Sequence, residues 1–217
     1  MHILLERKRI NMNIYIVRHG ETDWNVQLKL QGRSDIPLNA TGIEQAEQTG
    51  ENLKKAGISF DKVYSSPLQR AVKTAELISG FDSSNIIKEN RIIEFSFGKA
   101  EGSTPEERQS KPEFAQIKNF FTNPPAYSPD KDAETFDDVF KRTADFWENE
   151  IRPLADNSSN KNLLVVTHGG TLQTLLMHID GRTLKNFWKV RFPNCSINKV
   201  SLENGNFKLK WKSRVFY

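Results

Sequence analysis

Residues 13–21 read Asn-Ile-Tyr-Ile-Val-Arg-His-Gly-Glu, a short apolar, β-branched run that ends in Arg18-His19-Gly20-Glu21. The run predicts a buried strand, and it places a guanidinium and an imidazole where that strand leaves the sheet. Gly20 follows directly, which lets the backbone turn and a ligand approach closely. An arginine donates two parallel hydrogen bonds to a phosphate, and a neutral histidine offers a nitrogen nucleophile. The stretch therefore indicates a phosphate site at a strand end.

The composition is that of an ordinary globular protein. The chain has 217 residues, of which 37% are hydrophobic and 27% charged, which is enough for one large domain. No apolar run approaches the roughly 20 residues of a membrane span, and no signal-peptide core is recognisable. Residues 1–11 are expected to form a frayed extension before a domain over 12–217. Cys195 is the single cysteine, so no intramolecular disulfide forms, and we expect a cytoplasmic protein.

The net charge of +4 is unevenly spread. Residues 130–150 are rich in Asp and Glu, whereas 182–214 are strongly basic with Glu203 as the one acid. Such a bias can mark nucleic-acid binding, which would show a strongly salt-dependent affinity. We favour a solvated hairpin, because no basic run is interleaved with stacking aromatics. The expected partner is a small phosphorylated substrate, with no nucleic acid or membrane, in a monomer or homodimer.

Strand and helix patterns alternate along the chain. The expected strands cover residues 13–18, 62–65, 86–88, 163–167, 196–202 and 207–212. The 163–167 run is apolar throughout, as a central parallel strand buried on both faces should be. Asn204-Gly205 joins the last two strands as a hairpin.

Capping residues predict where the helices start. We expect a helix from Thr41 to about Ala56, one with Ser66 as N-cap, one over 105–121, one after Thr135 that Pro153 kinks or ends, and one over 172–179. The fold class is therefore α/β: a three-layer sandwich with a mostly parallel central sheet, helices on both faces, a C-terminal hairpin and a cap-like helical insertion.

Three strand-to-helix junctions carry residues that suit an anion. They are Arg18-His19-Gly20, the segment from Ser65 to Arg70, and His168-Gly169-Gly170. Ligands of open α/β sheets bind outside the carboxyl ends of the strands, and helix N-termini add free N–H groups and partial positive charge. If the three strands are neighbours, His19, Arg70 and His168 converge on one crevice.

These segments resemble the histidine phosphatase superfamily, the phosphoglycerate-mutase-like group. The Arg-His-Gly hallmark of that family matches residues 18–22 and continues to Trp24-Asn25. Residues 31–38 are similar to the next family segment, and residues 65–71 and 167–170 match the remaining hallmarks. The motifs follow the family order from about residue 13 to the hairpin.

The resemblance implies a role for each matched residue. His19 would attack phosphorus and carry a phosphohistidine, with its other ring nitrogen bound to a nearby backbone carbonyl. Glu94, in the loop before Phe97-Gly98, would give the leaving group a proton and then act as the base on water. The phosphoryl oxygens would be bound by Arg18, Asn25, Gln31, Arg70, His168 and the backbone at Gly169; Arg18, Arg70 and His168 would also stabilise charge during transfer. No metal and no cofactor is implied, because side chains supply the cations.

Four further acidic or imidazole groups are weighed against these roles. Glu21 is the main competitor for the proton donor, and it ranks lower because it follows the nucleophile directly. Glu101 matches another recurrent family position without an assigned side-chain role. His178 lies mid-helix and is expected to be structural, and His2 receives no role.

Two enzymatic activities share these residues. Mutases of the family typically carry Asn-Glu-Arg-x-Tyr-Gly in the acid loop and a longer insertion, whereas residues 93–98 lack that arginine. We therefore predict a phosphomonoester hydrolase, with phosphoglycerate mutase as the alternative. A non-catalytic phosphate-binding relative is the third possibility, and it is disfavoured because binding alone needs neither His19 nor Glu94.

Specificity is expected to come from the aromatic region 105–135. This region should cap the pocket, and its candidate residues are Phe114, Phe120, Phe121, Pro124, Pro125 and Tyr127. The substrate is not readable from the pattern, so sugar phosphates, nucleotide-derived phosphates and phosphoproteins are all candidates.

Overall fold

The computed structural model describes residues 11–157 and 161–217. Within these ranges six strands form one sheet in the order β3-β2-β4-β1-β5-β6. Their bounds are β1 (Asn11–Arg18), β2 (Lys62–Ser65), β3 (Ile87–Lys88), β4 (Lys161–Thr167), β5 (Ile197–Glu203) and β6 (Asn206–Arg214). Strands β1, β4, β2 and β3 pair in parallel, and β5 and β6 add an antiparallel hairpin beside β1. The predicted mostly parallel sheet and C-terminal hairpin are confirmed.

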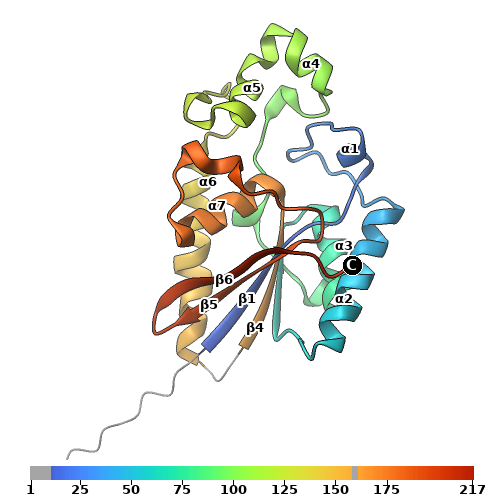
Figure 1. Ribbon diagram of the computed structural model, residues 1–217, viewed down its shortest axis with the longest axis vertical. Helices are drawn as coiled ribbons and strands as arrows, with labels where there is room; N and C mark the ends of the chain where they lie inside the picture. The colour runs from blue at the N-terminus through green and yellow to red at the C-terminus, as the bar shows by residue number, and fades with distance from the viewer. Residues whose placement is uncertain (1–10, 158–160) are drawn as a thin grey trace, which may run out of the picture.

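Helices cover both faces of this sheet, which makes the three layers (Figure 1). The α-helices are α1 (Asp23–Val26), α2 (Ala40–Lys55), α3 (Gln69–Ser79), α4 (Pro105–Ser110), α5 (Ala115–Thr122), α6 (Phe136–Asp145) and α7 (Gly169–Asp180). Short helical turns are η1 (Ser83–Asn85), η2 (Asn90–Ile92), η3 (Gly98–Ala100), η4 (Pro112–Phe114), η5 (Pro124–Ala126), η6 (Phe146–Ile151), η7 (Arg152–Asn157) and η8 (Leu184–Lys189). Helices α4 and α5 lie beyond the sheet at one end of the molecule (Figure 1).

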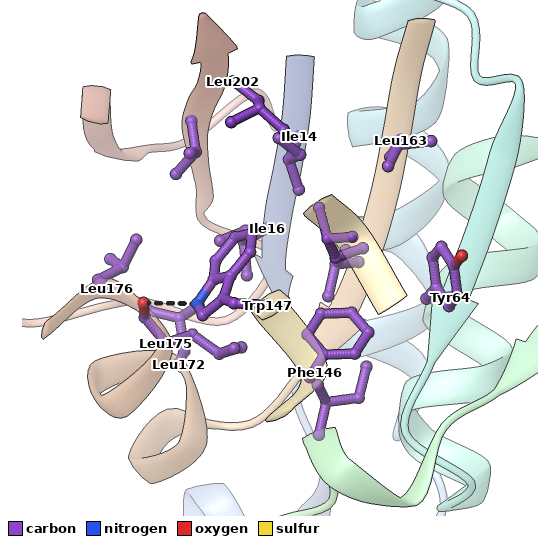
Figure 2. Close-up of a cluster of buried hydrophobic side chains, with 14 of the residues drawn as sticks. Ile14, Ile16, Tyr64, Phe146, Trp147, Leu163, Leu172, Leu175, Leu176 and Leu202 are labelled. Atoms are coloured by element: carbon purple, nitrogen blue, oxygen red, sulfur yellow. Dashed lines mark hydrogen bonds between the residues drawn. The ribbon is translucent and has the colours of Figure 1, made fainter. Parts of the chain in front are cut away.

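The alternation of side chains along β1 divides the core into two clusters, because successive strand residues face opposite ways. Ile14 and Ile16 pack with α7 and η6, whereas Tyr15 and Val17 pack with α2 and α3. Figure 2 shows the first cluster, in which Trp147 Nε1 donates a 3.0 Å hydrogen bond to the Leu175 carbonyl. Both faces of the sheet are thereby sealed, so the strand ends are where a ligand can enter.

Two predicted helix starts are wrong. Asn39 caps α2 in place of Thr41, because its side chain accepts a backbone N–H of the first turn. Helix α3 begins at Gln69, and its backbone N–H is accepted by Asp35 Oδ1 at 2.8 Å. The Ser66 hydroxyl lies outside the helix, where it accepts a long 3.4 Å hydrogen bond from Leu68 N and contacts the buried ring of His168 at 2.7 Å.

Other boundaries are partly as expected. Thr104 and Thr135 form capping boxes that begin α4 and α6. The helix predicted over 105–121 is broken near Pro112, because proline lacks the N–H that an uninterrupted helix needs. The expected frayed extension lies outside the described residues except for Asn11, which pairs with Glu203 and is the first residue of β1. In the part of the chain that the structure describes, no helix is long and apolar enough to cross a membrane.

Candidate active site

Three adjacent parallel strands bring the predicted junctions together. The hydrogen bonds between β1, β4 and β2 continue past the strand ends. His19 N donates to Thr167 O and Ser66 N donates to Val166 O, both at 2.9 Å. A cavity of about 540 Å³ opens at this edge of the sheet. Seven of the eight predicted site residues line it: Arg18, His19, Asn25, Gln31, Arg70, Glu94 and Gly169.

His19 is held in the form that a nucleophile requires. Its Nδ1 lies 2.7 Å from the Gly20 carbonyl oxygen, and a carbonyl can only accept, so Nδ1 carries the hydrogen. Nε2 therefore keeps its lone pair while the ring lines the cavity. Burial, followed by the charges of Arg70 and Arg18, lowers the pKa of His19 well below its ordinary 6.5. The imidazole is consequently neutral at pH 7 and able to attack phosphorus.

Gly20 has a different purpose from the one predicted. A Cβ at this position would lie 2.5 Å from the Gly42 carbonyl oxygen. The glycine therefore allows α2 to pack directly against the chain that follows β1. Close approach of a ligand is not its role, since Gly20 is not part of the cavity wall.

Arg70 is fixed at three points. Its Nη1 and Nη2 each donate a 2.7 Å hydrogen bond, to the carbonyl oxygens of Ser34 and Gly32, and its Nε lies 3.2 Å from His168 Nδ1. The side chain is almost wholly buried, and this burial lowers the pKa of Arg70 to about 10. The guanidinium thus remains cationic at pH 7 and is oriented before any anion arrives.

His168 stands behind Arg70, outside the cavity wall. A guanidinium can only donate, so Nδ1 of His168 accepts and Nε2 carries the hydrogen that Ser66 Oγ accepts at 2.7 Å. Burial and the charge of Arg70 lower the pKa of His168 well below 6.5, which keeps this tautomer neutral. In this geometry His168 orients Arg70, with both ring nitrogens engaged inside the protein, and its contact with a phosphoryl oxygen stays a prediction.

Arg18, Asn25 and Gln31 present polar groups to the cavity. Arg18 Nη1 donates to the Phe192 carbonyl at 2.8 Å, while its buried Nε has no partner among the described residues. The Oδ1 of Asn25 accepts from Thr22, which leaves the amide NH₂ as the group to face a ligand. Gln31 has a buried Oε1 that is likewise unpartnered within the described chain. Orphaned buried polar atoms are costly, so a polar ligand fits this wall.

Glu94 is docked on the N-terminus of α7. Its Oε1 accepts from Phe95 N, Thr171 N and Thr171 Oγ1 at 3.0 to 3.1 Å, and its Oε2 accepts from Gly170 N at 3.0 Å. A Cβ on Gly170 would lie 2.9 Å from Oε1, so a glycine is required for this contact. Oε2 has fewer donors among the described residues, since only Gly170 N is bound to it.

The two other acids of the region are structural. Glu101 accepts hydrogen bonds of 2.7 to 3.1 Å from Arg33 N, Ser34 N, Ser34 Oγ and Phe97 N, so it ties the loop that carries Gln31 and Gly32 to the acid loop. Glu21 accepts from Asn39 Nδ2 at 3.0 Å and does not line the cavity. Glu21 therefore supports the cap of α2, and the competing assignment as proton donor loses its geometric basis.

The outer wall of the cavity is aromatic and comes from two segments. Phe120 and Phe121 of α5 line it, as predicted for the region 105–135. Tyr127 instead packs inside an apolar cluster with Phe136. The second segment was not predicted: Trp188 of η8 lines the cavity together with residues 190–193, and its Nε1 donates to the Phe120 carbonyl at 2.7 Å. No sequence motif marks this segment, because its apolar residues read as ordinary core.

The described part of the chain contains no candidate metal site. No group of three or more His, Cys, Asp or Glu side chains is placed to hold a metal ion within residues 11–157 and 161–217. Cys195 is buried, and burial raises the pKa of its thiol to about 12. That thiol is therefore protonated at neutral pH and a poor nucleophile.

The chain belongs to the histidine phosphatase superfamily (branch 1), whose family model matches residues 14–214. It is 33% identical to "Uncharacterized phosphatase PhoE" of Bacillus subtilis, a similarity that covers 91% of this chain and 92% of that protein. It is also 28% identical to the 2,3-bisphosphoglycerate-dependent phosphoglycerate mutase of Enterococcus faecalis, over 81% of this chain and 88% of that one. Among solved structures, Bacillus stearothermophilus YhfR superposes with a TM-score of 0.83 and 29% identity, covering 94% of this chain and 98% of the other. Relatives thus include phosphatases and mutases, and the family resemblance seen in the motifs is confirmed.

Proposed function

We propose that this chain is a metal-independent phosphomonoester hydrolase that acts through a phosphohistidine on His19. The observation that carries the proposal is the neutral imidazole of His19, whose Nδ1 is committed to the Gly20 carbonyl, at a cavity that also holds Glu94. Arg18 and Arg70 supply the positive charge that phosphoryl transfer requires. Single-domain organisation over residues 12–217, a cytoplasmic location and a small phosphorylated substrate remain part of this proposal.

In the first step Nε2 of His19 forms a bond to phosphorus as the ester P–O bond breaks. The electron pair of that bond goes to the ester oxygen, which takes a proton from Oε2 of Glu94 and leaves as the alcohol. Arg70, fixed by two backbone carbonyls and His168, stabilises the charge on the transferring oxygens. Because these donors are already oriented, little reorganisation is needed during transfer.

In the second step a water molecule attacks the phosphohistidine. The water oxygen bonds to phosphorus, the N–P bond breaks, and its electron pair returns to Nε2 of His19. The carboxylate of Glu94 takes the proton of the water, which regenerates the acid for the next turnover. Inorganic phosphate is the second product.

Hydrolysis is favoured over mutase activity by the shape of the acid loop and the cavity. The loop from Ile93 to Gly98 packs Phe95 and Phe97 into an apolar cluster and offers no arginine for a substrate carboxylate. The outer wall adds the aromatic side chains of Phe121 and Trp188, with Lys29 and Arg191 also lining the cavity. The aromatic part of this wall suits a phosphomonoester with an apolar alcohol.

The test is turnover of phenyl phosphate in the presence of a metal chelator. Release of inorganic phosphate, with an acid-labile phosphoryl group trapped on His19, supports the proposal. The variant His19→Ala should lose both signals. Interconversion of phosphoglycerates that strictly requires a bisphosphoglycerate activator would show a mutase instead, and binding without turnover would show a phosphate-binding relative.

A further inference from the structure

Glu94 is held by its main chain as well as by its carboxylate. The Glu94 carbonyl oxygen accepts a 3.2 Å hydrogen bond from Arg33 Nε and a 3.3 Å hydrogen bond from Arg142 Nη2. Arg142 Nη1 also donates to the Arg91 carbonyl at 2.8 Å. Arg33, from the loop that also carries Gln31 and Gly32, and Arg142 of α6 therefore hold the backbone of residues 91–97, the segment that contains Glu94. This segment is called the strap below.

Glu134 links both arginines. Its Oε1 lies 2.7 Å from Arg33 Nη2 and 3.1 Å from Arg142 Nε, and its Oε2 accepts from Arg142 Nη2 at 3.1 Å. Glu134 also binds the strap directly. Its Oε2 accepts a hydrogen bond from Ser96 N at 3.1 Å, and its backbone N–H donates to Ser96 O at 2.9 Å. The Glu134 carboxylate thus fixes the positions of the Arg33 and Arg142 guanidinium groups and of the backbone at Ser96, two residues after Glu94.

The burial of this cluster indicates positioning rather than stability. The side chains of Arg142 and Glu134 are 15% and 18% exposed, and desolvation of such a pair offsets much of its Coulombic attraction. Charged groups with fixed geometry are needed where the orientation of a backbone carbonyl has to be set within a narrow range.

We propose that Glu134 is a positioning residue for the acid–base step, acting through Arg33 and Arg142 on Glu94. The inference rests on the proposed hydrolase function and adds a residue to it. The cluster determines where the Glu94 carboxyl stands relative to the leaving oxygen. Loss of the cluster should therefore weaken protonation of the leaving group and leave the attack by His19 intact.

The experiment measures kcat/KM, which reports the first transfer, for phosphomonoesters with alcohols of increasing pKa. Alkyl phosphates depend on the proton from Glu94, whereas nitrophenyl phosphate has a leaving group that departs without one. Glu134→Gln is expected to lower kcat/KM about tenfold or more for an alkyl phosphate and little for nitrophenyl phosphate, as part of the 10²–10⁴-fold that a positioned acid supplies. An equal loss for both substrates would show a merely structural role and would overturn the proposal.

A double-mutant cycle tests whether Glu134 acts through Glu94. In the Glu94→Gln background, which has no acid to position, Glu134→Gln should have no further effect on the alkyl phosphate. The same fold-loss in both backgrounds would contradict the proposal. Arg142→Lys is the second variant, since an amine keeps the charge but cannot reach Glu134 and the strap carbonyls together, and it should show the same dependence on the leaving group.

The matched control is Glu203→Gln in the β5–β6 hairpin. Glu203 also pairs with two cations, Lys208 and Lys210, and is 24% exposed. This control should leave kcat/KM unchanged for every substrate. If Glu94→Gln itself fails to affect alkyl phosphates more than nitrophenyl phosphate, the acid assignment in the proposed function is wrong, which is a different result from failure at Glu134.

Discussion

Gly32→Ala should damage both the stability and the phosphate site of this protein. Gly32 has φ +52°, and a Cβ there would lie 2.3 Å from Glu101 Oε1 and 2.6 Å from Glu101 Cδ. The alanine therefore meets two separate penalties. One is the left-handed backbone, and the other is displacement of the carboxylate that holds the loop.

The magnitude follows from those two penalties. The left-handed conformation costs an alanine about 1–2 kcal/mol. Glu101 accepts four hydrogen bonds, and each bond to a charged group is worth about 1.5–3 kcal/mol. Water replaces part of this set because Glu101 is partly exposed, so we count one or two lost bonds. The two penalties together predict a decrease of about 2.5–8 kcal/mol in the free energy of unfolding.

Gly80→Ala is the matched control. Gly80 ends α3 with φ +74°, and no atom lies within 4 Å of a Cβ built there. This variant carries the backbone penalty alone, about 1–2 kcal/mol. Urea unfolding of both variants measures the difference directly. Equal destabilisation of Gly32→Ala and Gly80→Ala would refute the argument from the Glu101 contact.

The same pair of variants separates activity from stability. The Gly32 carbonyl is one of the two that hold Arg70, so Gly32→Ala should weaken competitive inhibition by inorganic phosphate and raise KM. Gly80→Ala should leave both values unchanged under conditions where each variant is folded. Unaltered phosphate affinity in folded Gly32→Ala would show that the loop does not position Arg70.

Three further predictions follow from single contacts. Asp35→Ala removes the side chain that accepts from Gln69 N, so urea unfolding should show a loss of about 0.5–2 kcal/mol, and an unchanged midpoint would contradict the cap. Burial lowers the pKa of His19 and of His168 below 6.5. Below pH 6.5 the unfolded chain therefore binds protons that the folded chain does not. The stability that these neutral histidines contribute is complete above that pH, and the free energy of unfolding should fall below it by up to about 1.4 kcal/mol per pH unit for each histidine. Urea unfolding at pH 7.5 and 5.5 measures this, and no change would contradict it. Phe121→Ala, at a half-exposed position of the cavity mouth, should raise KM several-fold for phenyl phosphate and leave glycerol phosphate unaffected, whereas equal effects on both would argue against an apolar subsite.

Much of the fold was predictable because its signals are local. The apolar run 163–166 became part of the central strand β4, and the Asn-Gly pair became the turn between β5 and β6. Strand burial and tight turns depend on a few neighbouring residues, which the sequence states directly. The start of α3 was missed for the opposite reason: its capping group, Asp35, lies 34 positions away.

The candidate site divides in the same way. The sequence by itself determined which groups stand at the strand ends, because a motif such as Arg18-His19 is contiguous and the order of parallel strands brings such junctions to one edge. Only the tertiary structure decided what those groups do to one another. Arg70 contacts His168 across 98 positions, and Glu94 meets the N-terminus of α7 across 77. Hydrogen bonds over such separations depend on how whole elements pack, and residue patterns do not encode that geometry.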